Sequence, residues 1–390
     1  MRFVSALLLT GVTLLAQQPN TLTRQEAAAG WILLFDGESL FGWTQEGKAQ
    51  WRIANGILTS DEGENGWLRT TSPFADFILK CDWRTGPEGN SGVFLRSAAQ
   101  GAPHETGYEL QIWNQHPKFP TGSLVNHIAG KRVAAAPGEW HTYEVQAAGD
   151  HWIVKLDGRK VLDGRDPKSK SGYIGLQYNK DKKIEFRNIK LKPLGLEPIF
   201  NGKSLAGWKV VEPAKKPAQP AVWTAEKGAI HVVHGGGQLE TERTWADFIL
   251  QLDVRTNTSD PNRHPNSGIF FRGDPGTYWG GYESQIRNEY KDGDRTKPVD
   301  YGTGAIYNCV AARRIVAGDN EFFAQTLVVR GPHMAVWVNG YQVTDFEDSR
   351  PPDASARKGL RTSAGTIALQ AHDPTTNLDF KNIRIAGFPQ

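Results

Sequence analysis

Cysteine is scarce in this chain, whose 390 residues contain only Cys81 and Cys309. Two cysteines cannot build the disulfide framework of a small secreted domain, and no CxxC pair indicates a redox site. Each cysteine lies in a strand-like pattern, one in each half of the chain. Because free cysteine packs like a small apolar side chain, we expect two buried free thiols.

An excess of charge of one sign is also missing. The net charge is +3, from 45 Lys and Arg against 42 Asp and Glu, and neither sign forms a long run. The sequence therefore gives no reason to expect nucleic acid as a partner. The GxSxG, HExxH and P-loop motifs are absent too, which argues against a serine hydrolase, a zinc protease and a nucleotide-binding enzyme.

Long hydrophobic runs are absent beyond the N-terminus. Residues 3–15 form an apolar run after Arg2, and Ala16 and the polar QQPN follow. This run is too short to span a bilayer, so we expect no membrane insertion. Its pattern is typical of a signal peptide, residues 1–16, with cleavage after Ala16. The sequence thus predicts a periplasmic or secreted protein.

Repetition is what the sequence does have. Several phrases occur twice in the same order: LFDGESLFGW (34–43) and IFNGKSLAGW (199–208), ADFILKCDWRT (75–85) and ADFILQLDVRT (246–256), NSGVFLR (90–96) and NSGIFFR (266–272), GYELQIWN (107–114) and GYESQIRN (281–288). The repeating unit is far longer than the 20–50 residues of solenoid repeats. We therefore predict a duplicated domain, with copies at residues 30–194 and 197–390.

The repeated segments are typical of β-strands. They alternate apolar and polar residues, are rich in β-branched and aromatic side chains, and end in Gly, Pro, Asn or Asp. The Asp-Gly pair at 157–158 and the Asn-Gly pair at 339–340 are strong hairpin signals. Many short strands with dense turns predict an all-β protein of two tandem jelly-roll or β-sandwich domains.

Side-chain alternation predicts one polar face in the second copy. Successive side chains of a strand point to opposite faces, so every second residue shares a face. Three strands then offer polar stripes: Glu283, Gln285 and Arg287; Gln370 and His372; Phe270 and Arg272. If these strands lie side by side, a carboxylate, a guanidinium, an imidazole and amides meet on one surface.

The repeated phrases, together with EFRNIKL (185–191), resemble the 3-keto-disaccharide hydrolase domain family. The resemblance covers nearly all of the chain after the predicted signal peptide, as two copies. It implies a concanavalin-like jelly roll and hydrolysis of the glycosidic bond in sugars that carry a ketone at C3. A small carbohydrate is then the expected substrate.

The chemistry of such a substrate suggests roles for the polar stripes. A C3 ketone acidifies the proton at C2, and the enolate formed by its removal can expel the C1 substituent before water adds. This route needs a base, a donor for the enolate oxygen and an acid for the leaving group. We assign Glu283 or His372 as base, Arg272 and Gln285 as enolate donors, and Tyr307 or His372 as acid, without a cofactor. Gln370, Asn308 and Phe270 complete the predicted binding surface.

Direct displacement by two carboxylates stays open as an alternative. The second carboxylate would come from the loop after Arg287, which contains Asp292, Asp294 and Asp300. Structural interpretations also stay open. Arg272 could form an ion pair with Glu283, the two glutamines could form a cross-strand ladder, and His372 could be a solvated surface residue.

The two copies differ at titratable positions. Asn179 and Val125 stand in the first copy where His372 and Tyr307 stand in the second, and the second copy has longer loops. Loops at the rim of a sheet commonly build sites, so we predict that the second copy is catalytic. The first keeps a polar surface for binding sugar, made of Glu109, Gln111, Arg96 and Gln177. Lectin-like binding by both copies, without turnover, is the alternative function.

A metal site is the remaining question. Asp260, Asn262 and His264 lie on one loop and offer side chains that can ligate a metal. Oxygen ligands on a loop suit Ca²⁺, although this spacing matches no strong motif.

Overall fold

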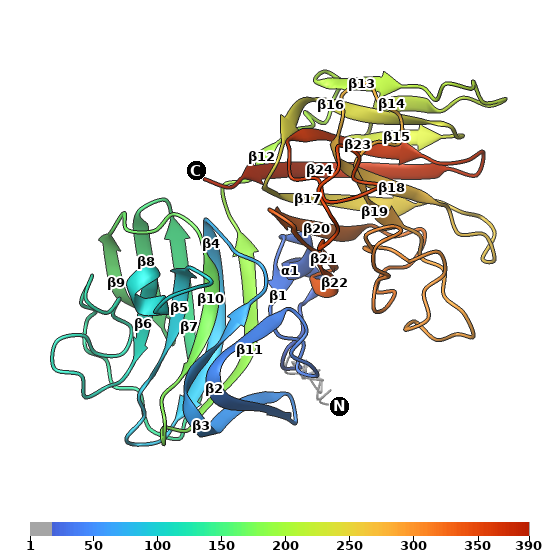
Figure 1. Cartoon of the computed structure of the whole chain (residues 1–390). Helices are drawn as coiled ribbons and strands as arrows, with labels where there is room; N and C mark the ends of the chain where they lie inside the picture. The colour runs from blue at the N-terminus through green and yellow to red at the C-terminus, as the bar shows by residue number, and fades with distance from the viewer. Residues whose placement is uncertain (1–17, 390) are drawn as a thin grey trace, which may run out of the picture.

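The computed structural model describes residues 18–389, which form two β-sandwich domains in tandem (Figure 1). The described chain is almost entirely strand and loop, with two short helices, α1 (Arg24–Ala28) and α2 (Pro103–Thr106). The all-β prediction is confirmed. The predicted signal peptide, residues 1–16, lies outside the described residues. No helix in residues 18–389 is long and apolar enough to cross a membrane.

The first domain is one sheet that folds over into two layers. Its strands are β1 (Ile32–Leu33), β2 (Trp43–Ala54), β3 (Ile57–Thr70), β4 (Phe77–Thr85), β5 (Ser91–Ser97), β6 (Tyr108–Ile112), β7 (His141–Ala148), β8 (His151–Leu156), β9 (Arg159–Arg165), β10 (Tyr173–Tyr178) and β11 (Ile184–Pro193). They pair in the order β6-β5-β10-β3-β11-β4-β7-β8-β9, with β1 on β11 and β2 on β3. The long strand β3 pairs with β10 at one end and with β11 at the other, and so joins the layers.

The second domain has two separate sheets. Its strands are β12 (Glu197–Pro198), β13 (Trp208–Val211), β14 (Val222–Glu226), β15 (Ala229–Val233), β16 (Gly237–Trp245), β17 (Phe248–Thr256), β18 (Ser267–Gly273), β19 (Tyr282–Ile286), β20 (Phe323–Arg330), β21 (His333–Val338), β22 (Tyr341–Glu347), β23 (Gly365–Ala371) and β24 (Asn377–Gly387). The five-stranded sheet has the order β13-β16-β23-β18-β19, and the other has the order β14-β15-β24-β17-β20-β21-β22 with β12 on β24.

Both predicted hairpin turns are present. Asp157 and Gly158 join β8 to β9, and Asn339 and Gly340 join β21 to β22. All four residues have positive φ, between 49° and 77°. Asn, Asp and Gly accept this conformation at least cost, which explains why these dipeptides stand at the turns.

Alternation along the strands builds the two cores. In the second domain Leu239, Ile269, Phe271 and Leu369 are fully buried between its sheets. The two cysteines are free, Cys81 buried in the first core and Cys309 half-buried at the edge of the second. Two free thiols were predicted, although only Cys81 is fully buried.

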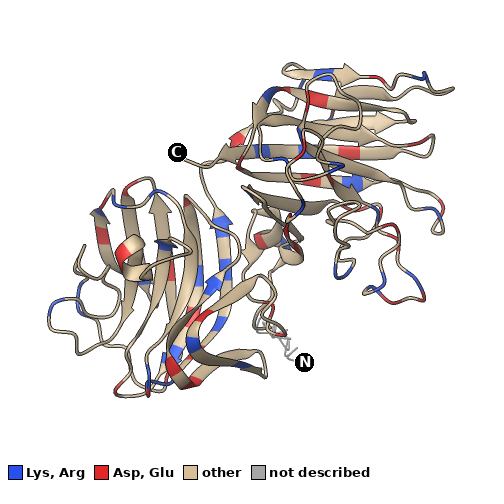
Figure 2. Cartoon of the chain, viewed as in Figure 1, with Lys and Arg blue, Asp and Glu red and all other residues tan. Residues whose placement is uncertain are grey.

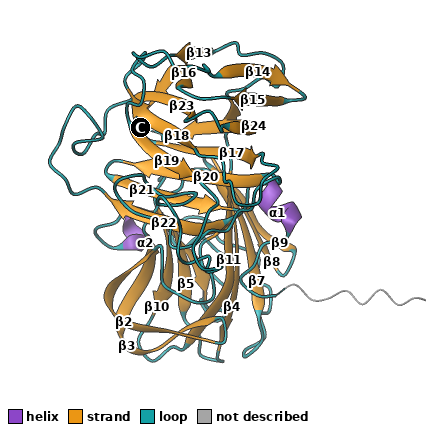
Figure 3. Ribbon diagram, turned by 90° about the vertical axis from the view of Figure 1, so that its right-hand side faces the viewer, coloured by secondary structure: helices purple, strands orange, loops and turns teal. Residues whose placement is uncertain are grey.

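The N-terminal segment that contains α1 and β1 lies between the domains (Figures 1 and 3). Trp337 of β21 donates its indole N–H to the carbonyl of Leu33 at 2.9 Å, and Arg313 pairs with Asp36 at 2.8 Å. Ile249, Val328, Ala335 and Trp337 of the larger sheet join the core cluster of the first domain. The outer face of that sheet is therefore partly covered, whereas the five-stranded sheet lies away from the first domain.

Charged residues of both signs are interspersed over both domains (Figure 2). The local arrangement of charges, rather than the net charge, therefore distinguishes one surface from another.

Candidate functional site

Three rows of side chains cross the outer face of the five-stranded sheet. Strand register aligns them as Glu240, Ala368, Phe270 and Glu283 in the first row, Gln238, Gln370, Gly268 and Gln285 in the second, and His372, Asn266 and Arg287 in the third. We call this surface the polar floor. The predicted stripes thus lie on neighbouring strands, and β16, which the sequence did not single out, adds Gln238 and Glu240.

Glu283 is the most buried acid of the predicted set, with 3% of its surface exposed. Burial raises the pKa of its carboxyl, while the charges of Arg357 and His372 and a hydrogen bond from Trp279 partly oppose this rise. Its Oε2 pairs with Nη2 of Arg357 at 3.0 Å. A carboxylate whose pKa is raised by burial is a stronger base than an exposed one.

The glycine of the repeated phrase NSG makes room for this acid. A Cβ on Gly268 would lie 2.4 Å from Oε1 of Glu283, because that side chain leans over the neighbouring strand. In the first domain a Cβ on Gly92 would lie 2.9 Å from Cγ of Glu109. The glycine and the acid therefore form a matched pair in both copies.

The assignment of Arg272 to the polar floor is wrong. Arg272 has φ of 55° and lies where the β18–β23 register shifts, so the alternation of side chains is broken there. Its guanidinium is fully buried and pairs with Asp247 at 3.0 Å. It also donates to the carbonyls of Ala246, Gly331 and Arg361. The alternative, an ion pair with Glu283, is also wrong.

Arg96 behaves in the same way in the first domain, and its assignment to sugar binding is likewise wrong. It has φ of 52°, is 1% exposed and pairs with Asp76 at 2.9 Å. Three backbone carbonyls accept its other donors. The repeated arginine is thus a structural residue that ties each strand end to the neighbouring loops.

Arg357 supplies the cation that Arg272 does not. It lies in the loop between β22 and β23, above the ring of Phe270, with 5.4 Å between Cζ and the ring centroid. This loop is much longer than its counterpart between β9 and β10 of the first domain, which has no equivalent arginine. The extra length was a signal in the sequence, but nothing in the sequence singled out this residue.

Tyr307 lies beside two acids. Burial raises the pKa of its hydroxyl, and the negative charges of Asp300 and Glu283 raise it further. Its backbone N–H donates to the carbonyl of Glu283 at 2.9 Å. The phenol therefore stays protonated near neutral pH and is placed to donate a proton.

Of Asp292, Asp294 and Asp300, the three acids predicted for the loop that follows β19, Asp300 is the one that is hydrogen-bonded to amides of the polar floor within the described residues. Its Oδ2 accepts hydrogen bonds from Gln285 at 3.0 Å and Asn266 at 3.3 Å. Asp292 pairs with Lys297, and Asp294 accepts from Thr296. The amide ladder between Gln285 and Gln370 does not form, because Gly268 stands between them in the row.

His372 and Asn308 lie at the edge of the polar floor. The His372 side chain is 40% exposed, and its Nδ1 contacts the carboxylate of Asp373 at 2.9 Å. The charge of His372 is one of the smaller influences that lower the pKa of Glu283. Asn308 is exposed and has φ of 61°. Among the described residues, its side chain makes no hydrogen bond to an acid of the polar floor.

Trp279 is a residue of this site that the sequence did not reveal. It is the one exposed tryptophan among the described residues, at 47%, and its ring centroid lies 5.1 Å from Cζ of Arg357. Its φ is 62°, which is unusual for a bulky side chain. The backbone N–H of Trp279 donates to Oε1 of Gln238 at 2.9 Å.

Three buried polar atoms around the floor have no hydrogen-bond partner within residues 18–389: Oε1 of Gln370, Oδ1 of Asn266 and Nε of Arg357. Most buried polar atoms in proteins are hydrogen-bonded, so such a cluster needs an explanation. Hydroxyl groups of a bound molecule, or water, would satisfy these atoms. The arrangement therefore suits a polar, hydroxyl-rich ligand.

Comparison with known proteins places the chain in a family. A family described as the 3-keto-alpha-glucoside-1,2-lyase-like domain matches residues 30–192 and 195–386. The chain belongs to this family. A relative from Bacteroides thetaiotaomicron, named 3-keto-disaccharide hydrolase, is 30% identical over 246 aligned positions that cover 47% of this chain and 84% of the relative. The resemblance seen in the sequence is confirmed.

Two solved structures are similar to one half of the chain. A protein of Parabacteroides distasonis assigned as a glycosyl hydrolase is 24% identical, with 45% of this chain and 99% of that chain covered and a TM-score of 0.40. A carbohydrate-binding module from Bacillus subtilis is 21% identical, with 39% and 95% covered and a TM-score of 0.33.

The first copy of the family domain has a different floor. Trp67 and Arg69 of β3 stand where Gln238 and Glu240 stand in the second copy. Burial raises the pKa of Glu109 to about 7, although a hydrogen bond from Gln177 opposes the rise. Gln111 is buried, and its Oε1 has no partner within the described residues. This copy keeps the acid and the amides but lacks counterparts of Arg357 and Tyr307.

The structure does not support the predicted metal site. The carboxylate of Asp260 accepts the backbone N–H of Asn262, and His264 is bound through Nδ1 to Asp319. Within residues 18–389, no three His, Cys, Asp or Glu side chains are grouped so that they could hold a metal ion.

Proposed function

We propose that the second domain cleaves the glycosidic bond of sugars that carry a ketone at C3. One observation carries the proposal: the buried carboxyl of Glu283, with a raised pKa, is bound by Arg357 and has the hydroxyl-bearing side chain of Tyr307 beside it. This set contains a base, a cation and an acid. Membership of the family supports the same substrate class.

Glu283 acts as the base that takes the proton from C2. The electron pair left behind forms the enolate, whose charge on the C3 oxygen is stabilised by Arg357. When the ketone reforms, the C1–O bond breaks and a C1–C2 double bond appears. Tyr307 gives its proton to the departing oxygen. Arg357 thus replaces Arg272 in the role predicted from the sequence, and His372, at the edge, is the alternative acid.

Elimination and hydration together account for two names in the comparisons. Elimination alone is a lyase reaction, which is the activity in the family's description. Addition of water then places a hydroxyl at C1 and a proton at C2, and the sum is hydrolysis, the activity in the name of the B. thetaiotaomicron relative. Glu283 and Tyr307 can serve both steps: in the hydration step Tyr307, now deprotonated, takes a proton from water, and Glu283, now protonated, returns a proton to C2.

Direct displacement by two carboxylates is the competing mechanism, favoured by the position of Asp300. The negative charges of Asp300 and Glu283 both raise the pKa of Tyr307, so each carboxylate acts on this hydroxyl. The isotope content of the product separates the routes. Elimination in D₂O places deuterium at C2 of the product, whereas direct displacement leaves the C2 hydrogen in place.

The first domain is proposed to bind sugar without cleaving it. Its floor keeps Glu109, Gln111 and Gln177 but has Val125 in place of Tyr307. Lectin-like binding by both domains without turnover is the alternative.

Export to the periplasm or medium is proposed from residues 1–16 alone, and fractionation of cells that express the full chain tests it.

The central experiment measures sugar release from 3-keto-trehalose or 3-keto-lactose by the purified protein. We expect Glu283→Gln to lower kcat/KM by roughly 10²- to 10⁴-fold, because a positioned acid or base contributes about that much. The matched variant Glu109→Gln should cause the smaller loss. Absence of cleavage by the wild-type protein would leave only the binding function, and a larger loss with Glu109→Gln would move the chemistry to the first domain.

A further inference from the structure

The loop that joins β18 to β19, residues 274–281, carries Trp279 beside the polar floor. A single exposed apolar side chain is common on protein surfaces and by itself indicates no function. The backbone sets Trp279 apart, because its φ of 62° is costly for a bulky residue. Such a conformation persists only where the surroundings hold it, and it is found most often at ligand-binding and active sites.

Two buried side chains of β16 hold this loop against the polar floor. Glu240 accepts the backbone N–H of Gly276 at 2.8 Å, and Gln238 accepts the backbone N–H of Trp279 at 2.9 Å. The amide nitrogen of Gln238 also donates to the carbonyl of Thr277 at 3.2 Å. Both side chains are only 2% exposed. The loop is therefore attached to the floor at three points, and Trp279 needs no ligand to hold its place.

The indole ring lies next to the groups proposed for catalysis. Cζ of Arg357 is 5.1 Å from the centroid of the Trp279 ring, and Nη2 of the same guanidinium is 3.0 Å from Oε2 of Glu283. Burial, the largest influence, raises the pKa of Glu283, and Trp279 is one of the smaller influences that lower it. Because Trp279 is 47% exposed, a sugar ring bound at Glu283 has open indole surface beside it.

The floor next to this loop has hydrogen-bonding atoms to spare. Gln238 stands directly opposite Gln370 of β23, whose Oε1 is buried and has no partner within residues 18–389. Opposite residues on neighbouring strands have Cβ atoms about 4.5–5.5 Å apart. Nε of Arg357 is also buried without a partner in that part of the chain. An acceptor and a donor near Trp279 are thus available to the hydroxyl groups of a ligand.

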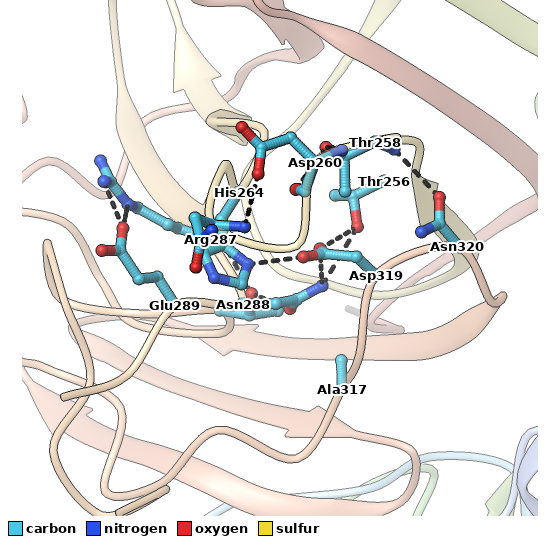
Figure 4. A network of polar contacts seen from close by, with 12 residues as sticks. Thr256, Thr258, Asp260, His264, Arg287, Asn288, Glu289, Ala317, Asp319 and Asn320 are labelled. Carbon is cyan, nitrogen blue, oxygen red and sulfur yellow. Dashed lines mark hydrogen bonds and ion pairs between the residues drawn. The ribbon is translucent and has the colours of Figure 1, made fainter. Parts of the chain in front are cut away.

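A second polar network of this domain offers no such atoms (Figure 4). Asp319 accepts hydrogen bonds from Thr256 at 2.6 Å and Asn288 at 3.0 Å, and its other oxygen is bound to His264. Among residues 18–389, none of these four side chains has a buried polar atom without a partner. This network therefore supports the fold, whereas the floor keeps unpaired atoms beside an exposed aromatic ring.

We propose that Trp279 is a stacking platform for the sugar ring that binds at Glu283. A pyranose ring has hydroxyl groups around its edge and C–H groups on its faces. Its hydroxyls can bind the floor while one C–H face covers the indole, which offers the largest flat apolar area of any side chain. The proposal rests on the proposed function of the second domain, and it gives Trp279 a role in binding rather than in proton transfer.

The first domain has no such platform. Its corresponding loop, residues 98–107, contains no aromatic residue. Trp67 and Arg69 occupy the positions of Gln238 and Glu240, and Arg69 is bound to Glu46 at 3.0 Å. Stacking of this kind therefore belongs to the second domain alone.

The test measures binding separately from turnover. Glu283→Gln removes the base and keeps the shape of the side chain, so 3-keto-trehalose stays intact during calorimetric titration. In this background we expect Trp279→Ala to weaken binding by roughly 10- to 100-fold, because the apolar area buried on the indole is lost. Trp279→Phe keeps an aromatic face and should recover most of the affinity.

Fluorescence and a control variant distinguish stacking from a general effect on the surface. Covering an exposed indole moves its emission to shorter wavelength, so saturation with 3-keto-trehalose should shift the emission of Glu283→Gln and not that of the Trp279→Phe double variant. Phe322→Ala is the matched control, because Phe322 is 36% exposed and has Arg255 and Lys381 beside its ring. It should leave both the affinity and the shift unchanged.

The outcomes separate this inference from the proposed function. If Trp279→Ala binds as tightly as its parent, if Phe322→Ala loses as much affinity, or if Glu283→Gln binds no sugar, the platform is wrong. The proposed function then still stands wherever the wild-type protein cleaves 3-keto-trehalose. If the wild-type protein does not cleave this sugar but Trp279→Ala alone weakens binding, the proposed function is wrong and Trp279 keeps its role in sugar binding.

Discussion

The carboxylate of Glu283 lies over the backbone of Gly268 on the neighbouring strand, so closely that a Cβ there would be 2.4 Å from Oε1. Gly268→Ala must therefore displace the carboxylate. Misplacement of a catalytic group by about 1 Å can cost 10²-fold in rate, and we expect kcat/KM to fall by roughly 10- to 100-fold. Steady-state kinetics on a 3-keto-disaccharide measures the effect.

Gly92→Ala is the matched control for this substitution. Gly92 has the same place beside Glu109 in the first domain, where a Cβ would be 2.9 Å from Cγ. Both variants disturb a strand to a similar extent, so differences in folding should be small. Equal losses of activity in the two variants would show that the position of Glu283 is unimportant.

The buried guanidinium of Arg272 leads to a prediction about stability. It pairs with Asp247, whose side chain is 31% exposed, and donates to three backbone carbonyls. Removing one member of a buried ion pair costs about 3–5 kcal/mol, because the partner groups lose their hydrogen bonds. We expect Arg272→Ala to lower the free energy of unfolding by about that amount, measured by urea denaturation.

Arg272→Lys should recover only part of this stability, because one ammonium cannot reach all four acceptors. Arg96→Ala should be equally costly in the first domain, where Arg96 has equivalent contacts. If Arg272→Ala has wild-type stability and reduced turnover, the structural role is wrong and Arg272 acts in the active site.

The fold could be predicted from the sequence because its signals are local and duplicated. Each strand carries its own alternation, and each hairpin its own turn residues. The order of the phrases, given twice, then defines the two domains. The same alternation placed Glu283, Gln285 and Gln370 on one face, as their register on neighbouring strands shows.

The site could be predicted only where the strands are regular. Alternation fails at Arg272, because a residue with positive φ at a register shift turns its side chain to another side. Arg357 and Trp279 come from loops, where no period relates sequence position to direction. The longer loops of the second copy indicated that its site is more elaborate, but not which side chains it contains.

Arg357 should set the pH dependence of the reaction. Its positive charge lowers the pKa of Glu283 against the effect of burial. Without it that pKa rises further, and because the base acts when deprotonated, a higher pH is needed for activity. We expect the acidic limb of the kcat/KM profile to move to higher pH in Arg357→Ala, with a plateau lower by about 10²- to 10³-fold.

Arg357→Lys keeps the positive charge, so its acidic limb should lie close to the pH of the wild-type limb. Its plateau value of kcat/KM should stay below that of the wild type, because lysine lacks the planar guanidinium that makes two hydrogen bonds. Profiles for the wild type and both variants, from pH 5 to 9, provide the test. A limb that stays in place in Arg357→Ala would mean that Glu283 is not the titrating base.

Glu109 should make the first domain less stable as the pH rises. Its folded-state pKa is about 7, against an ordinary value of 4.5, because burial disfavours the charged form. Below about 4.5 the carboxyl is protonated in both states. Between 4.5 and 7 the unfolded chain releases the proton while the folded chain keeps it, so the free energy of unfolding falls. Above about 7 the whole penalty is present.

Glu109→Gln removes that penalty while keeping the shape of the side chain. We expect the variant to be more stable than the wild type at pH 8, by on the order of 1–3 kcal/mol, and nearly equal to it at pH 5. Urea unfolding followed by tryptophan fluorescence at both pH values measures the difference. Glu105→Gln, at an exposed acid of the same domain, is the matched control. A gain at pH 8 no larger than the control's would indicate that the Glu109 carboxyl is already charged in the folded protein at neutral pH.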